Sequence, residues 1–161
     1  MLTKTNNSFD AVIETPVCRF GLQFDNGFLS STEYLKKDYE LYLPEAETVQ
    51  VLIRQISDYF LDPANAFNIE IRPKGTDFQQ RVWRQMQKIP AGQVKTYGEV
   101  AKILNSSPRA VGNACRANPM PLIIPCHRIV SSSGLGGFAG TRSGYFTEIK
   151  RQLLRHEGLE I

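Results

Sequence analysis

Residues 118–130 read NPMPLIIPCHRIV, and no other stretch of the sequence says as much about the fold. The apolar residues 122–124 and 129–130 are typical of two short buried strands. A thiol, an imidazole and a guanidinium stand between them on consecutive residues, Cys126–Arg128. The prolines in this stretch restrict the backbone, which suits a site that must be rigid.

Cys126 and His127 are a candidate nucleophile and base. A thiol in apolar surroundings is normally inert, and only the thiolate is a good nucleophile, so a nearby base is required. Adjacent residues on an extended strand point apart, so the pair needs a turn at Pro125-Cys126 or a bridging water. The alternative is a buried cysteine beside a histidine that has its own hydrogen bonds, and the pair alone does not separate the two.

Residues 96–116 have the pattern of two helices joined by a tight turn. Thr96 and Glu99 have the spacing of a capping box. Asn105-Ser106 predicts the turn, and Ser107-Pro108 predicts the start of the second helix. One face of this helix is polar and basic with a glycine at its centre: Arg109, Gly112, Asn113 and Arg116. The pattern is that of a helix-turn-helix, but a plain helical hairpin fits these residues as well.

Residues 1–73 are expected to form a small α/β lobe. Apolar and polar residues alternate over residues 18–24, which predicts a half-buried strand, and Asn26-Gly27 predicts a hairpin turn. Pro44 is expected to open a helix, and residues 69–71 have the pattern of another short strand.

Residues 76–161 are expected to form a mainly helical second domain after a linker at residues 72–75. Thr76 is a candidate N-cap for the first helix of this domain. The apolar face of that helix consists of Phe78, Val82, Trp83 and Met86. The fold class is therefore α+β.

The net charge of +3 hides an asymmetry. Residues 1–75 hold seven Lys/Arg and eleven Asp/Glu, a net −4, whereas residues 76–161 hold twelve and five, a net +7. A basic half beside an acidic half suggests that only the second half meets a polyanion, although an uneven surface alone could give the same numbers.

The three cysteines do not have the paired spacing of a disulfide framework, and they fit a reducing compartment. Cys18 and Cys115 are expected to be packing residues. Residues 1–75 contain one cysteine and no histidine, so they cannot supply a zinc site of the Cys/His type. Because no run is long and apolar enough for a membrane span or a signal peptide, we expect a cytoplasmic protein, nucleoid-associated if it is bacterial.

Several segments in order resemble the O6-alkylguanine-DNA alkyltransferases, also called methylated-DNA–protein-cysteine methyltransferases. The active-site stretch 118–130 resembles their signature. The matching segments upstream and downstream are residues 78–83, 89–92, 96–101, 109–114, 136–140 and 150–158. Residues 1–75 contain no matching motif and resemble the family only in their expected order of strands and helix. In this family the N-terminal lobe is ribonuclease H-like.

The resemblance implies a role for each catalytic residue. Cys126 would accept the alkyl group, and His127 would take its proton through a water while Glu157 orients the imidazole. Asn118 would brace the active-site turn, and Tyr97 would donate a proton or hydrogen bond to the leaving guanine.

The resemblance also implies the contacts with DNA. Arg109 would enter the duplex and fill the gap left by the flipped nucleotide. The full set expected at the DNA is Arg109, Gly112, Asn113, Arg116, Thr96 and Arg128. The set expected to line the base pocket is Tyr97, Met120, Pro121, Gly137 and Phe138.

The function implied is repair of double-stranded DNA that contains O6-alkylguanine. The alkyl group would move irreversibly to Cys126, once per molecule, in a monomer without cofactor or metal. Activity on O4-alkylthymine stays open. Two other interpretations of the residues are a DNA-binding regulator that performs no chemistry and a cysteine hydrolase that uses Cys126 and His127.

Overall fold

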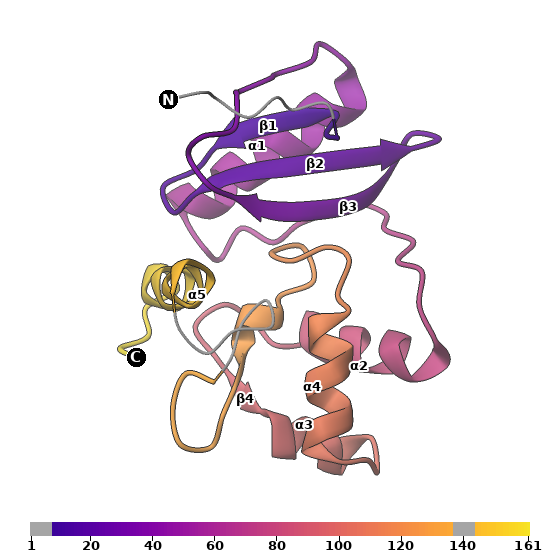
Figure 1. Cartoon of the computed structure of the whole chain (residues 1–161), viewed down its shortest axis with the longest axis vertical. Coiled ribbons are helices and arrows are strands. Elements are labelled where there is room, and N and C mark those ends of the chain that lie inside the picture. Colours follow the sequence, from indigo (N-terminus) through magenta and orange to yellow (C-terminus); the bar gives the residue numbers. More distant parts are fainter. Residues whose placement is uncertain (1–7, 137–143) are drawn as a thin grey trace. The chain divides into compact units, whose positions relative to one another are not determined.

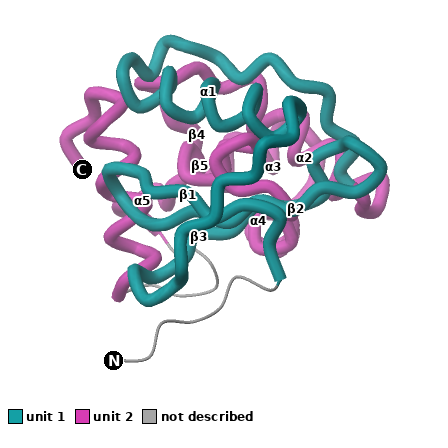
Figure 2. Tube along the Cα trace, turned by 90° about the horizontal axis from the view of Figure 1, so that it is seen from above, with its two compact units in different colours: residues 1–73 teal, residues 74–161 magenta. Residues whose placement is uncertain are grey.

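The computed structural model describes residues 8–136 and 144–161. The chain divides into two compact units, Met1–Pro73 and Lys74–Ile161, coloured separately in Figure 2. None of the helices within the described ranges combines the length and the apolar character that a bilayer span requires.

The first unit is built on a three-stranded antiparallel sheet in the order β1-β2-β3. Its strands are β1 (Ala11–Glu14), β2 (Arg19–Asp25) and β3 (Phe28–Leu35). The predicted hairpin turn joins β2 to β3: Asn26 has φ 49° and Gly27 has φ 80°. Two successive positive φ values match the twist of the strands, and Asn-Gly adopts them at low cost.

Helix α1 (Glu47–Leu61) lies across one face of this sheet (Figures 1 and 2). Its buried residues recur at helical spacing: Val49, Leu52, Ile56 and Tyr59. The prediction that Pro44 opens the helix is wrong. Tyr42 still pairs with Val12 through two backbone hydrogen bonds of 2.9 Å, so the chain is extended immediately before Pro44.

The strand predicted at residues 69–71 is also wrong. Only Ile71 pairs, in an isolated parallel bridge to Leu29 of β3. A single bridge adds an apolar side chain to the sheet edge without the ladder that defines a strand.

The second unit contains four α-helices and a two-stranded sheet within its described residues. The helices are α2 (Asp77–Gln87), α3 (Tyr97–Ile103), α4 (Pro108–Arg116) and α5 (Tyr145–His156). The strands are β4 (Lys95–Thr96) and β5 (Ile129–Val130), which pair in parallel. Helix α4 packs against both α2 and α3.

The helix starts in this unit follow the sequence signals. The side chains of Thr76 and Thr96 each complete a capping box, at α2 and α3 respectively. The Ser107 side chain accepts from the Ala110 N–H at 3.2 Å and caps α4. Asn105 has φ 53° in the turn between α3 and α4, where a left-handed residue ends a helix.

The strand predicted at residues 122–124 is wrong. These residues form a turn, closed by the Ile124 N–H donating to the Met120 carbonyl at 2.8 Å. Leu122 has φ 76° and is 2% exposed. Burial of the apolar side chains without an extended backbone explains why the apolar pattern was misleading.

Candidate active site

Cys126 stands at the start of a tight backbone turn. Pro125 has φ −80° and ψ 70°, and the Cys126 N–H donates to the Ile124 carbonyl at 2.8 Å, which is an inverse γ-turn. A 3₁₀ turn, η1 (Cys126–Arg128), follows directly and packs against α2 and α5. With three residues per turn, its consecutive side chains point in three different directions. The turn at Pro125-Cys126, one of the two alternatives for the Cys126–His127 pair, is therefore present.

Asn118 braces this turn from one side. Its Nδ2 donates to the Ile124 carbonyl at 2.8 Å, and its Oδ1 accepts from the Met120 N–H at 2.9 Å. Both ends of the 120–124 turn are thereby held by one side chain. The same side chain also acts on the Cys126 thiol and lowers its pKa.

The Cys126 thiol is buried, with 9% of the residue exposed. Burial raises the pKa of the thiol, because the thiolate loses its hydration. The hydrogen bond from Asn118 and the charge of Lys150 act in the opposite direction and lower this pKa. The effect of burial is the larger, so the pKa is raised overall and these two neighbours offset only part of the cost of forming the thiolate.

His127 is fully buried and faces Glu157. Its Nε2 lies 2.8 Å from Glu157 Oε1, and neither side chain is exposed. Burial lowers the pKa of His127, although the contact with Glu157 works against this effect. A neutral imidazole whose Nε2–H donates to the carboxylate has its lone pair on Nδ1. No protein group among the described residues hydrogen-bonds that Nδ1.

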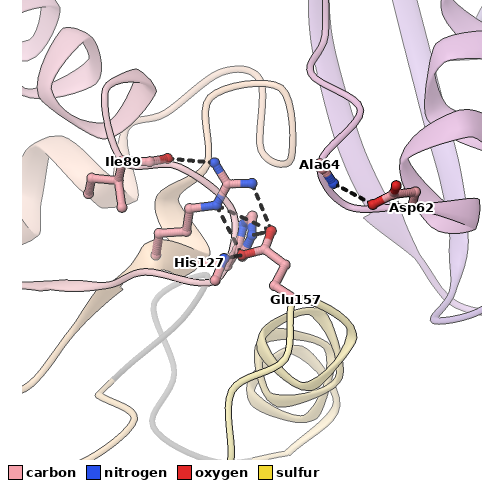
Figure 3. A network of polar contacts seen from close by, with 7 residues as sticks. Asp62, Ala64, Ile89, His127 and Glu157 are labelled. Carbon is pink, nitrogen blue, oxygen red and sulfur yellow. Dashed lines mark hydrogen bonds and ion pairs between the residues drawn. The ribbon is translucent and has the colours of Figure 1, made fainter.

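Arg128 completes the network around the Glu157 carboxylate, shown in Figure 3. Its Nη2 donates to Glu157 Oε1 at 2.8 Å and its Nε to Oε2 at 3.1 Å, while Nη1 donates to the Ile89 carbonyl at 2.7 Å. Burial alone would raise the pKa of Glu157, but the hydrogen bonds from His127 and Arg128 hold it well below its usual range. The carboxylate is therefore charged and fixed in position.

The placement of Arg128 differs from the DNA contact expected of it. Its side chain is only 12% exposed, and its guanidinium is bound to Glu157 and to the Ile89 carbonyl. A buried carboxylate next to a histidine needs a further cation, and the adjacent guanidinium reaches it. This placement points to a role in holding Glu157 instead.

Lys150 is a buried cation that sequence reasoning missed. It lies on α5 with none of its surface exposed, and its Nζ donates to the Ile129 carbonyl at 2.7 Å. Burial lowers its pKa to about 8, while the thiols of Cys126 and Cys115 raise it. The available signal was its helical spacing: Lys150 follows Phe146 by four residues and precedes Leu153 by three, on the apolar face of α5.

Tyr97, the first residue of α3, lies between two glycines. A Cβ added to Gly112 of α4 would lie 4.0 Å from Tyr97 Cε1, and one added to Gly136 would lie 3.3 Å from Cε2. Burial raises the pKa of Tyr97 to about 12, and the nearby thiols of Cys115 and Cys126 add to the increase. The phenol is therefore protonated and can donate a hydrogen bond close to Cys126.

The polar face of α4 is open to solvent. Arg109, Asn113 and Arg116 are exposed and Gly112 is half-buried, whereas Val111 and Ala114 are buried. Thr96 is half-buried, and its hydroxyl accepts from the Glu99 N–H at 3.0 Å as the cap of α3.

The residues expected in the base pocket differ in their exposure to solvent. Met120 is fully buried and Pro121 is half-buried. Gly137 and Phe138 lie outside the described residues. Over the described part of the chain, no three His, Cys, Asp or Glu side chains are grouped so that they could hold a metal ion.

Comparison with known proteins gives consistent matches. A family model described as 6-O-methylguanine DNA methyltransferase, DNA binding domain, matches residues 77–159. The methylated-DNA–protein-cysteine methyltransferase of Methanosarcina acetivorans is 35% identical over 156 residues, which are 92% of this chain and 97% of that protein. The enzyme of the same name from Sulfolobus acidocaldarius is 41% identical over 122 residues, 76% of each chain.

Solved structures agree with these matches. Mycobacterium tuberculosis O6-methylguanine methyltransferase superposes with a TM-score of 0.74 at 32% identity, covering 91% of this chain and 90% of that chain. The structure of the M. tuberculosis OGT in complex with DNA gives a TM-score of 0.76 at 33% identity with the same coverage. The α+β architecture, an antiparallel sheet followed by a mainly helical part, is confirmed by these matches.

Proposed function

Because the chain belongs to the methylated-DNA–protein-cysteine methyltransferase family, we propose that Cys126 is the residue on which it accepts the methyl group. The family reaction, repair of O6-methylguanine in DNA by methyl transfer to a cysteine, is the reaction of this protein. The observation that carries the proposal is the His127–Glu157 pair beside Cys126, whose imidazole Nδ1 has no hydrogen-bond partner among residues 8–136 and 144–161.

In the proposed reaction the thiol of Cys126 loses its proton to Nδ1 of His127 through a bridging water. The thiolate sulfur then attacks the methyl carbon, so that a carbon–sulfur bond forms while the bond between that carbon and O6 breaks. The electron pair of the broken bond passes to the guanine, which takes up a proton. Tyr97 favours this departure by donating a hydrogen bond to the leaving base.

The remaining site residues hold these groups in place. Glu157 fixes the tautomer of His127, and Arg128 holds Glu157. Asn118 and the Lys150 ammonium stabilise the thiolate. Because regenerating Cys126 would require its thiolate to leave from the methyl carbon of a stable thioether, and a thiolate is a poor leaving group there, we propose that each molecule reacts once and that no cofactor takes part.

The polar face of α4 is the proposed DNA contact. The damaged atom cannot be reached inside a duplex, so the nucleotide must leave the stack. Arg109, exposed in the first turn of α4, would fill the space that it leaves. The half-buried Gly112 would allow a close approach of the helix to the minor groove. Arg116, Asn113 and Thr96 would contact the backbone.

We also propose that the protein acts as a monomer in the cytoplasm, associated with the nucleoid if the protein is bacterial. Cys18, Cys115 and Cys126 are all free thiols, as a reducing compartment requires. The substrate would be double-stranded DNA that contains O6-alkylguanine.

The test is incubation with duplex DNA that carries a labelled O6-methylguanine. We expect one label per protein molecule, on the peptide that contains Cys126, and no transfer to Cys126→Ala, which should still bind DNA. Label on Cys18 or Cys115 would contradict the assignment. DNA binding without transfer would support the regulator, and repeated turnovers would support the hydrolase.

A further inference from the structure

Trp83 connects two helices of the second unit. It lies on α2, is 1% exposed, and donates from its indole Nε1 to the Ala114 carbonyl of α4 at 2.8 Å. It is the only tryptophan of the chain. Most buried tryptophans find some acceptor, so the identity of this acceptor is what matters.

The Ala114 carbonyl lies in the last turn of α4, where carbonyls have no partner within their own helix. The neighbouring carbonyls find backbone donors: Asn113 O accepts from the Ala117 N–H at 3.1 Å, and Cys115 O accepts from the Asn118 N–H at 3.2 Å. The regular helical donor to Ala114 O would be the Asn118 N–H, which is engaged with Cys115 instead. The indole of Trp83 therefore replaces the missing helical bond from a different helix.

The indole ring is also held on its other side. A Cβ added to Gly75 would lie 2.5 Å from Trp83 Cη2 and 2.7 Å from Cζ3. Such distances are far below van der Waals contact, so only glycine fits against the ring in this arrangement. The ring is confined while its N–H points at the end of α4.

We propose that Trp83 is a positioning residue for DNA binding, which fixes the C-terminal end of α4 by capping the Ala114 carbonyl. Arg116 and Asn118 follow this carbonyl within four residues, so the cap sets where the exposed guanidinium stands relative to the active-site turn. The inference rests on the proposed role of the α4 face in DNA binding. Asn118 keeps its own bonds to Met120 and Ile124, so the thiol site does not depend on the indole.

A single-atom replacement tests the donor without changing the packing. Because the chain has one tryptophan, replacing tryptophan throughout by benzothienylalanine changes Trp83 alone and puts sulfur in place of the N–H. We expect this protein to bind methylated duplex DNA about three- to tenfold more weakly, the factor that corresponds to one neutral hydrogen bond. Its rate with free O6-benzylguanine, which needs no DNA contact, should stay within about twofold of the natural protein.

Unchanged DNA affinity, at a temperature where circular dichroism shows both proteins folded, would overturn the inference. An equal loss with the duplex and with the free base would do the same, because it would indicate general damage to the site. If the proposed function itself were wrong, the natural protein would fail to take up the alkyl group from DNA. The two failures are therefore distinguishable.

Gly75→Ala provides an independent perturbation of the same ring. The added methyl must displace the indole, so we expect a shift in the emission of the single tryptophan together with weaker DNA binding. A shifted emission with unchanged DNA affinity would show that the indole can move without consequence for α4. That result would also overturn the inference.

Discussion

His127 Nε2 lies 2.8 Å from Glu157 Oε1, and neither side chain has any surface exposed to solvent. The carboxylate comes from the C-terminal cap of α5 and the imidazole from η1, 30 residues earlier in the chain. This contact favours the neutral imidazole with its hydrogen on Nε2, which leaves Nδ1 as the atom that takes the Cys126 proton in the proposed reaction.

Glu157→Gln should slow methyl transfer by about 100-fold, because a neutral amide no longer favours the tautomer with a free Nδ1. It should also lower the free energy of unfolding by about 2–4 kcal/mol, since the Arg128 guanidinium loses its buried counter-charge. Single-turnover rates with methylated duplex and urea unfolding measure the two effects. The matched control is Glu148→Gln on the same helix, where the carboxylate forms an exposed pair with Arg151. Comparable losses in both variants would contradict the role of Glu157.

The stability of the protein should fall below about pH 6.5. Burial lowers the pKa of His127 from its usual 6.5, so the unfolded chain takes up a proton that the folded protein does not. The stability that the neutral His127 contributes is fully present above pH 6.5 and is lost as the pH falls toward the pKa of the folded protein. The free energy of unfolding then changes by at most about 1.4 kcal/mol per pH unit. Because the pKa of Glu157 is also lowered, stability falls further only below about pH 4.5, the usual pKa of a glutamate.

Urea unfolding between about pH 6.5 and 4.5 isolates the histidine, because this window lies above the usual pKa of the carboxylate. His127→Asn should show a flatter dependence of the unfolding free energy on pH over the same window. An identical slope in the variant would assign the pH dependence to other groups.

Lys150→Met should slow methyl transfer at pH 7 by about tenfold or more, because the ammonium lowers the pKa of the Cys126 thiol and each pKa unit is a factor of ten in thiolate. The stability should change little, since removing a buried charge offsets the lost bond to the Ile129 carbonyl. The pKa of Lys150 is about 8, so the rate ratio between natural protein and variant should shrink by pH 9. A constant ratio from pH 7 to 9 would mean that the charge is not what matters.

Arg109→Ala should reduce the rate on methylated duplex far more than the rate with free O6-benzylguanine, because the guanidinium acts only on the base stack. Arg54→Ala, which removes an exposed arginine of the first unit, is the control and should behave like the natural protein. Equal losses on both substrates would give Arg109 another role.

Methylation of Cys126 should destabilise the protein. The thiol is buried and hydrogen-bonded by Asn118, so an added methyl group overpacks the site by about 1–3 kcal/mol. For a chain of this size the midpoint of thermal unfolding should fall by about 2–10 °C. Natural protein before and after complete reaction, without DNA, gives the comparison, and Cys126→Ala treated in the same way gives the control. A midpoint that stays or rises would indicate a site with room for the group.

The features that the sequence predicted are those with local causes. Asn26-Gly27, the Thr96–Glu99 capping box and the turn at Cys126 depend on a few neighbouring residues, and the structure has all three. The contact between His127 and Glu157 followed from the family resemblance, since nothing in the spacing of the two residues indicates it.

The features that the sequence did not predict depend on residues distant in the chain. Arg128 turns toward Glu157 because η1 packs against α5, and a strand-like pattern cannot reveal this. Lys150 can be buried because its ammonium group donates a hydrogen bond to the Ile129 carbonyl of β5. Leu122 adopts a positive φ because Asn118 holds both ends of its turn, which overrides the preference of a leucine for extended backbone.

The two residue pairs of the parallel sheet, Lys95 with Ile129 and Thr96 with Val130, join the backbone just before Tyr97 to the backbone just after Arg128. The backbone near Tyr97 is thereby held against the backbone near Cys126 by main-chain hydrogen bonds, which do not depend on side-chain identity. Substitutions in the surrounding loops that keep these pairs would leave this backbone arrangement in place. In the proposed reaction each molecule acts once and has no later cycle in which to correct a poor alignment, so a backbone arrangement fixed by main-chain bonds would protect that one reaction from sequence drift.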